Sequence, residues 1–98
     1  MSERRARRST RDNPETALHL FGATIRTLRK QRGLRQADLA ATTGLPRTSI
    51  SAIEHGQRNV TLLHLLHLAV ALRVPPSHLF QVLDARPDLY TPDHLEIS

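Results

Sequence analysis

The sequence predicts an all-α fold, a compact globule of five helices, and three observations carry this prediction. Apolar residues recur at intervals of three and four along the chain, as they do on one face of an α-helix. No segment alternates apolar and polar residues with the period of two that marks a strand. The connections between the apolar segments are short, roughly two to six residues. With 98 residues the chain is long enough for one domain with a single modest core.

The first helix is expected to start near Asn13–Pro14 and to end at Gly33. Asn13 is a good N-cap, proline is tolerated at the first helical position, and Glu15 favours the positive end of the helix. A glycine after an apolar periodic run is a helix stop signal. Four apolar residues follow helical spacing in this segment: Leu18, Phe21, Ile25 and Leu28.

Two short helices are expected next, over residues 36–43 and from about Pro46 to His55, with a tight turn at Gly44 between them. The second carries only two large apolar residues, Ile50 and Ile53, and its other side chains are mostly short and polar. A helix with so little apolar surface is a poor core element. Its outer face is therefore expected to meet something outside the protein.

The last two predicted helices complete the domain. Thr61 can cap a fourth helix that runs through Leu72, and Pro75–Pro76 begins a fifth. The five helices lie within residues 13–83, which we interpret as one domain. The apolar side of the fifth helix consists of Leu79, Phe80, Val82 and Leu83.

Charge is distributed unevenly around this domain. Residues 1–12 carry five arginines against two acids and are predicted to form a flexible, disordered basic arm. Residues 13–83 carry eight Lys or Arg against three acids, whereas residues 84–98 form a short acidic C-terminal tail with one arginine against four acids. A basic body with an acidic tail suggests a polyanionic partner, of which nucleic acid is the commonest and an anionic membrane the second choice.

The composition argues against several other classes of function. The chain has no cysteine, which excludes disulfides and thiolate metal sites and fits a reducing cytoplasm. His64 and His67 interrupt the longest apolar region, so no segment approaches the about 18 apolar residues of a membrane span. With two Phe, one Tyr and no Trp, aromatic stacking platforms for single strands are not expected.

No sequence motif supports catalysis or cofactor binding. Ser, His and Asp are all present, but no nucleophile elbow, metalloprotease motif or glycine-rich phosphate loop surrounds them. His64 and His67 could face one metal ion, but no third ligand is evident, and a solvated helix face is the commoner reason for this spacing. We therefore expect no enzyme activity, no cofactor and no metal site.

Two short helices joined by a tight turn, inside a small basic helical domain, are the plan of a helix-turn-helix DNA reader. The landmarks over residues 20–81 are Ile25-Arg26, Leu28-Arg29, Gly33-Leu34, Gln36, Leu39-Ala40, Gly44-Leu45, Ile50-Ser51, Ile53-Glu54, Gly56, Arg58-Asn59, Leu62, Ala69, Leu72, Val74 and Leu79-Phe80. In one register and without gaps, this pattern resembles the phage-repressor/Cro-like (Xre) helix-turn-helix family. The resemblance implies a repressor-like domain whose third helix lies in the major groove of double-stranded DNA.

The resemblance assigns the outward residues of the third helix to base reading. Arg47 is the strongest candidate, because a guanidinium can pair bidentately with guanine. Thr48 can contact a thymine methyl group or donate a hydrogen bond. The alternative interpretation is that these residues only solvate a surface helix. The implied base-reading residues are Arg47, Thr48, Ser51 and Ala52.

The resemblance also implies contacts to the phosphate backbone on either side of the third helix. Gln36 begins the second helix, where the glutamine of the family commonly binds phosphate with help from the positive helix end. The alternatives are ordinary helix capping for Gln36 and a turn role for Asn59. The implied phosphate-contacting residues are Gln36, Arg35, Arg58 and Asn59.

Glu54 requires a separate explanation. A carboxylate in the last turn of a helix is opposed by the negative helix end, and on a DNA-binding face it would repel phosphate. Arg29 occupies the position of the family's partner for this glutamate. We therefore expect a structural ion pair between Arg29 and Glu54, with Arg29 not contacting DNA.

The fourth predicted helix is apolar all round, which implies burial from more than one side. Leu63 and Val70 stand where the family usually has charged residues. A second subunit would bury them, and a symmetric homodimer would bind a palindromic or near-palindromic site. The alternative is that the tail covers them through Leu89, Tyr90 or Leu95. The expected dimer interface consists of Leu63, Val70, Leu79 and Phe80.

These observations predict a cytoplasmic, sequence-specific transcriptional regulator that binds double-stranded DNA as a homodimer. The alternative is an antitoxin-like or adaptor module whose acidic tail and apolar helix bind a protein partner, with DNA binding secondary. Phage repressors, controller proteins of restriction–modification systems and antitoxins all fit the first prediction. Binding to DNA through many phosphates would show a steep dependence on salt, which distinguishes the two alternatives.

Overall fold

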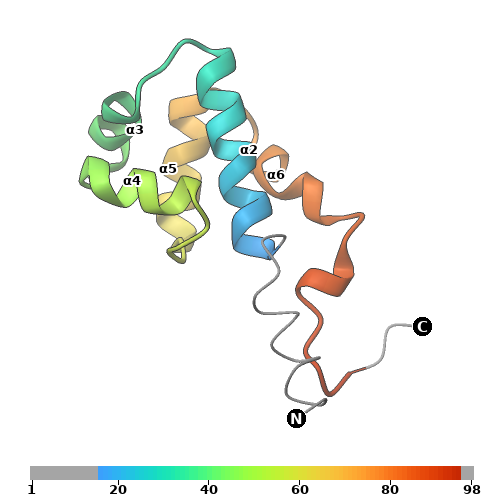
Figure 1. Cartoon of the computed structure of the whole chain (residues 1–98). Helices are drawn as coiled ribbons and strands as arrows, with labels where there is room; N and C mark the ends of the chain where they lie inside the picture. Colours follow the sequence, from blue (N-terminus) through green and yellow to red (C-terminus); the bar gives the residue numbers. More distant parts are fainter. Residues whose placement is uncertain (1–15, 96–98) are drawn as a thin grey trace.

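The computed structural model describes residues 16–95, and the fold class that it shows is all-α (Figure 1). No strand occurs within this range. Two short 3-10 helices, η1 (Gln81–Leu83) and η2 (Pro87–Leu89), follow the last α-helix. The α-helices are α2 (Ala17–Gln31), α3 (Gln36–Thr43), α4 (Arg47–Glu54), α5 (Leu62–Leu72) and α6 (Pro76–Phe80). Residues 16–95 thus contain five α-helices, and the predicted five-helix architecture is confirmed.

The helices pack around α2, which stands near the centre of the molecule in Figure 1. Helix α2 packs against α4 and α6, and α3 packs against both α4 and α5. Each α-helix contributes at least one completely buried side chain to a single core. These side chains are Ile25, Leu39, Ile50, Ile53, Leu68, Leu72 and Leu79.

Helix α2 begins later than the sequence predicted. Thr16 has extended backbone geometry, and its Oγ accepts a hydrogen bond of 3.1 Å from the backbone N–H of His19, so Thr16 is the N-cap. Asn13 and Pro14 themselves lie outside the described residues. The helix therefore starts at Ala17, and the local hydroxyl cap decides its first turn.

The turn between α3 and α4 follows the prediction. Gly44 ends α3 with a positive φ of 78°, a left-handed conformation that glycine adopts without a steric cost. Its backbone N–H donates to the carbonyl oxygen of Ala40 at 2.9 Å. Pro46 then serves as the extended N-cap residue of α4. The two helices lie side by side on the left of Figure 1.

The C-terminal helices agree with the prediction only in part. Helix α5 runs from the Thr61 cap to Leu72 as expected. Helix α6 ends at Phe80, and the chain continues as the tighter η1 instead of a longer α-helix. Leu79 is completely buried in the core, so its assignment to a dimer interface is wrong. In a helix of only five residues, the buried position alone anchors the element to the rest of the domain.

Within residues 16–95, no helix combines the length and the apolar character that crossing a membrane requires. The same range contains no group of three or more His, Cys, Asp or Glu side chains arranged to hold a metal ion. The rings of His64 and His67 lie with their centroids 6.4 Å apart.

Helices α2 and α4 approach each other closely at Gly22, which leads to a prediction. An alanine Cβ there would lie 2.8 Å from the carbonyl oxygen of Glu54 and closer still to that of Ile53. Gly22→Ala should therefore destabilise the domain by about 1–3 kcal/mol through overpacking, although alanine favours helices. Urea unfolding measures this loss. Thr27→Ala, at an exposed position of the same helix, should stay within about 0.5 kcal/mol. A Gly22→Ala protein as stable as the parent would contradict the close approach.

Candidate nucleic-acid interface

Helix α4 is divided lengthwise into a buried face and an outward face. Its buried face consists of Ser49, Ile50, Ile53 and Glu54. The opposite face carries the four predicted base-reading residues, Arg47, Thr48, Ser51 and Ala52. Arg47 and Thr48 are exposed, and Ser51 and Ala52 are half-buried. The result is an outward ridge of short side chains with one long cation at its N-terminal end.

Two isoleucines attach this ridge to the domain. Ile50 and Ile53 are almost completely buried in the core between the helices. Burying side chains of this size contributes about 1.5–3 kcal/mol each. Helix α4 is therefore held firmly by one face although its other face touches nothing within residues 16–95 that would bury Arg47 or Thr48.

The predicted ion pair between Arg29 and Glu54 is present and bidentate. Arg29 Nε donates to Glu54 Oε2 at 2.6 Å, and Nη2 donates to Oε1 at 3.1 Å. The two side chains are only 11% and 1% exposed. The hydrogen bond to Glu54 raises the pKa of the Arg29 guanidinium above its ordinary value. Arg29 also donates through Nη1 to the carbonyl oxygen of Leu34 at 3.0 Å, so it is a buried scaffold residue.

Gln36 joins the same cluster. Its Nε2 donates to Glu54 Oε1 at 3.1 Å. This hydrogen bond connects the first turn of α3 with the last turn of α4. Arg35, and not Gln36, is the N-cap residue of α3. The hydrogen bond to the Glu54 carboxylate therefore holds the Gln36 amide in place, and the second hydrogen of its NH₂ group remains available for another acceptor.

Arg35 stands at the start of α3 together with Asp38. The backbone N–H of Arg35 donates to Asp38 Oδ2 at 2.7 Å, and the two side chains form an exposed ion pair of 3.3 Å. These contacts, the backbone hydrogen bond first, lower the pKa of Asp38 below its ordinary value. The carboxylate caps the helix, and it compensates part of the Arg35 charge.

Arg58 and Asn59 lie in the loop after α4 and are both exposed. Arg58 Nη1 donates to Ser49 Oγ at 2.6 Å. Asn59 lines a shallow apolar hollow together with Leu65 and Phe80. No sequence pattern predicts a role for Ser49, because its contact with Arg58 depends on how the loop turns back along α4.

Helix α5 presents exposed apolar side chains, which we call the α5 patch: Leu62, Leu63, Leu66 and Val70. Leu63 and Val70, predicted for the interface, are 60% and 69% exposed. Leu62 and Leu66 were missed, although they share the four-residue spacing that leads to Val70. Phe80 is exposed on α6.

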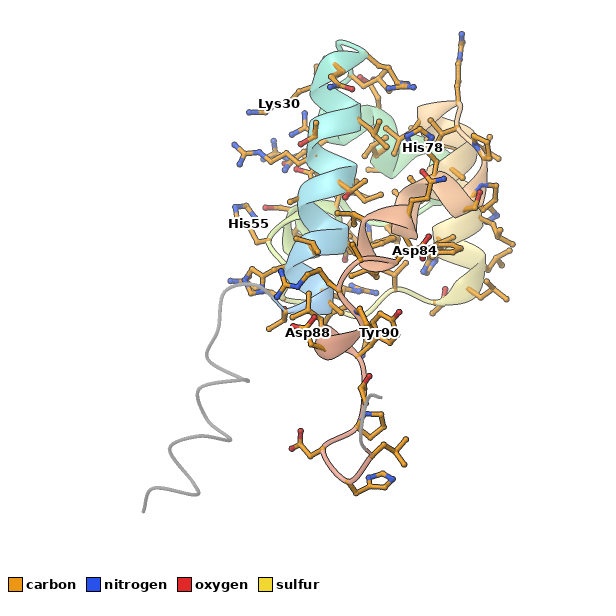
Figure 2. All side chains as sticks on the ribbon, turned by 90° about the vertical axis from the view of Figure 1, so that its right-hand side faces the viewer. Lys30, His55, His78, Asp84, Asp88 and Tyr90 are labelled. Atoms are coloured by element: carbon orange, nitrogen blue, oxygen red, sulfur yellow. The ribbon has the colours of Figure 1, made fainter. Side chains whose placement is uncertain are left out.

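The acidic tail lies on the other side of the molecule from α3 and α4. In Figure 1 it continues from α6 at the lower right, and Figure 2 shows Asp84, Asp88 and Tyr90 along this segment. Tyr90 and Leu95 are exposed, and Leu63 and Val70 stay exposed as well. In this structure the described part of the tail therefore does not bury the α5 patch, contrary to the alternative expectation.

The arrangement of α3, α4 and their turn defines a class of protein. Residues 25–79, more than half of the chain, match the helix-turn-helix family. The chain therefore belongs to the helix-turn-helix family.

Particular members of this family are similar to the chain. Over 68 residues it is 35% identical to y4dJ, an uncharacterised HTH-type transcriptional regulator of Sinorhizobium fredii, covering 69% of this chain and 88% of that protein. The restriction–modification controller protein C.AhdI from Aeromonas hydrophila is 46% identical, with a TM-score of 0.62 over 64% of this chain and 96% of that one. The controller protein C.Esp1396I, a tetramer in complex with its natural 35 base-pair operator, is 33% identical, with a TM-score of 0.61 over 70% of this chain and 91% of that one.

The buried ion pair leads to a stability prediction. Glu54→Ala leaves the Arg29 guanidinium buried without a countercharge, so we expect a loss of about 3–5 kcal/mol in the free energy of unfolding. Denaturant unfolding followed by circular dichroism measures this loss. Asp88→Ala removes the carboxylate of an exposed pair with Arg86 and should change stability far less. Equal effects of the two substitutions would show that burial of the Arg29 pair does not matter.

Proposed function

We propose that the protein is a transcriptional regulator that binds a specific double-stranded DNA site with α4 in the major groove. The single observation that carries this proposal is the outward ridge of α4. An α-helix with short outward side chains fits the major groove closely enough for them to reach base edges. Arg47 would pair bidentately with a guanine, Thr48 and Ser51 would form hydrogen bonds, and Ala52 would offer an apolar contact.

The charge distribution supports this orientation. Arg47 stands at the N-terminal end of the ridge and Arg58 in the loop after α4, and neither forms an ion pair with another residue of the range 16–95. The carboxylate of Glu54 on the same helix is buried and paired with Arg29, so it does not repel phosphate. The acidic tail extends on the opposite side (Figure 1).

Backbone contacts would come from both sides of the ridge. Gln36 begins α3, where the helix dipole and the first N–H groups favour an anion. Arg35 and Arg58 would add charge-assisted hydrogen bonds to phosphates, and Asn59 would contribute a neutral one. These contacts fix the register of α4 in the groove without reading sequence themselves.

We further propose that the protein acts as a homodimer through the α5 patch. Leu62, Leu63, Leu66 and Val70 form a stripe of exposed apolar side chains of the kind that marks an association surface. A symmetric dimer would place two copies of α4 about one DNA turn apart, so the site would be palindromic or nearly so. The operator complex of C.Esp1396I, a relative with the same fold, supports assembly on DNA.

Among the possible regulatory roles we favour that of a controller protein of a restriction–modification system, acting in the cytoplasm and without enzymatic activity. The similarity to two such controller proteins supports this role. Phage repressors and antitoxins fit the same sequence pattern, and the similarity to these two relatives is what distinguishes the controller role from them.

Selection of bound sequences from random duplex DNA tests the proposed function. We expect an enriched motif with two-fold symmetry and half-sites separated by about one helical turn, roughly 34 Å. A protein that retains no motif, or that binds all duplexes equally, would overturn the proposal.

Arg47 leads to a prediction about specificity. Arg47→Ala should weaken binding to the selected site by about 1–3 kcal/mol and relax the preference at one base pair per half-site, because a bidentate contact is lost. Fluorescence anisotropy with a set of single-base variants of the site measures both effects. Arg73→Asn removes the same charge outside α3 and α4, at a left-handed position that asparagine tolerates, and should leave the base preference unchanged. Equal loss on every duplex would remove Arg47 from base reading.

The α5 patch leads to a prediction about assembly. Leu63→Asp should convert the dimer into monomers, because a charge would be buried in the centre of an apolar interface. Sedimentation velocity measures the mass in solution. Val82→Asp introduces the same charge at an exposed apolar residue outside the patch and should leave the dimer intact. If Leu63→Asp remains dimeric, the interface lies elsewhere.

A further inference from the structure

The loop after α4 folds back along the helix that it leaves. The backbone N–H of Gly56 donates to the carbonyl oxygen of Ile53 at 3.0 Å, and that of Gln57 donates to the carbonyl oxygen of Ala52 at 2.8 Å. With Gly56 at a φ of 71°, this is a left-handed helix end that reverses the chain. Arg58 follows the reversal, and its guanidinium reaches Ser49, nine residues earlier on α4.

Ser49 is well placed to hold a side chain in one position. It belongs to the third position of a helix that the core fixes, and it is only 7% exposed. Its Oγ accepts from Arg58 Nη1 at 2.6 Å, a short distance for a hydrogen bond from a charged donor. The hydroxyl is therefore a fixed acceptor beside the ridge, on a residue too buried to touch a duplex itself.

The partner of Arg58 differs in kind from the partners of other arginines. Arg29, Arg35 and Arg86 each pair with a carboxylate, which compensates their charge. Arg58 is held by a neutral hydroxyl and forms no ion pair within residues 16–95. Its position is restricted while its charge stays available.

A long flexible cation loses rotamer freedom when it binds, and this loss weakens the complex. A guanidinium that already points along α4 avoids part of the loss. Of its five N–H donors, only one is used by Ser49, so the others remain free for an anion. A phosphodiester beside the groove that α4 enters is the anion that this geometry fits.

We propose that Ser49 is a positioning residue that orders Arg58 in the free protein for contact with a DNA phosphate next to α4. This inference rests on the proposed function. Ser49 acts only through Arg58, so its contribution to DNA binding disappears when Arg58 is absent.

A double-mutant cycle tests the inference on the duplex that selection identifies. Dissociation constants are measured over a range of salt concentrations for the parent, Ser49→Ala, Arg58→Ala and the double variant. We expect Arg58→Ala to reduce the steepness of the salt dependence by about 0.9, the loss of one phosphate contact. Ser49→Ala should weaken binding about 2–10-fold and keep the steep dependence, because the charge is still present. The double variant should bind like Arg58→Ala alone.

Controls separate positioning from folding. Ser49→Thr keeps the hydroxyl and should restore most of the affinity, and Ser77→Ala removes an exposed hydroxyl on α6 and should change nothing. Relaxation of the Arg58 Nε–H signal in DNA-free protein should show greater mobility in Ser49→Ala than in the parent. This signal reports the ordering of Arg58 without any duplex.

The outcomes distinguish this inference from the proposed function. If the parent binds DNA specifically but the losses of the two single variants add, Ser49 has only a structural role and the inference is wrong. An Arg58 side chain equally mobile in the parent and in Ser49→Ala also overturns it. If the parent binds no duplex, the proposed function fails and the inference fails with it.

Discussion

The carboxylate of Glu54 determines how the helices of the proposed DNA-binding face are arranged. It accepts two hydrogen bonds from Arg29 on α2 and one from Gln36 on α3, while it belongs to α4 itself. Three helices are thus joined at one buried group, close to the point where Gly22 lets α2 and α4 approach. Since removal of either charged partner would leave the other buried and unpaired, the arrangement tolerates little change at this point. The hydrogen bonds of Glu54 therefore determine the direction in which the ridge of α4 faces.

Helix α4 shows how a short segment can serve the core and a surface at once. Two isoleucines provide the apolar contacts of its inner face. Glu54 and Ser49 occupy the rest of that face and form polar contacts there. This leaves the outer face free of large side chains. The short polar side chains that make this segment a poor core element therefore suit the proposed function. They allow the backbone of α4 to lie close to the floor of the major groove.

Much of the fold was predictable because local signals are strong at particular residues. Gly44 marks the turn and Thr61 the cap of α5, and the pairing of Arg29 with Glu54 follows from the cost of a carboxylate at a helix end together with the family resemblance. Other features needed three-dimensional information. The start of α2 depends on the hydroxyl of Thr16, which accepts from the backbone N–H of His19, whereas the sequence pattern predicts the cap at Asn13 instead. The burial of Leu79 and the contact between Ser49 and Arg58 depend on the direction of a short helix and of a loop, and apolar spacing does not encode either.

The position of the acidic tail has a consequence for the speed of association. Within residues 16–95 the acidic tail lies on one side of the molecule, and Arg47 and Arg58, which have no ion-pair partner in this range, lie near α4 on the other, so this part of the chain has an uneven charge distribution that acts as an electric dipole. In the field of a polyanion a dipole experiences a torque, so the molecule is turned during diffusion until its cationic side leads. Collisions in the wrong orientation become rarer, and productive encounters are reached with fewer trials, most strongly in dilute salt.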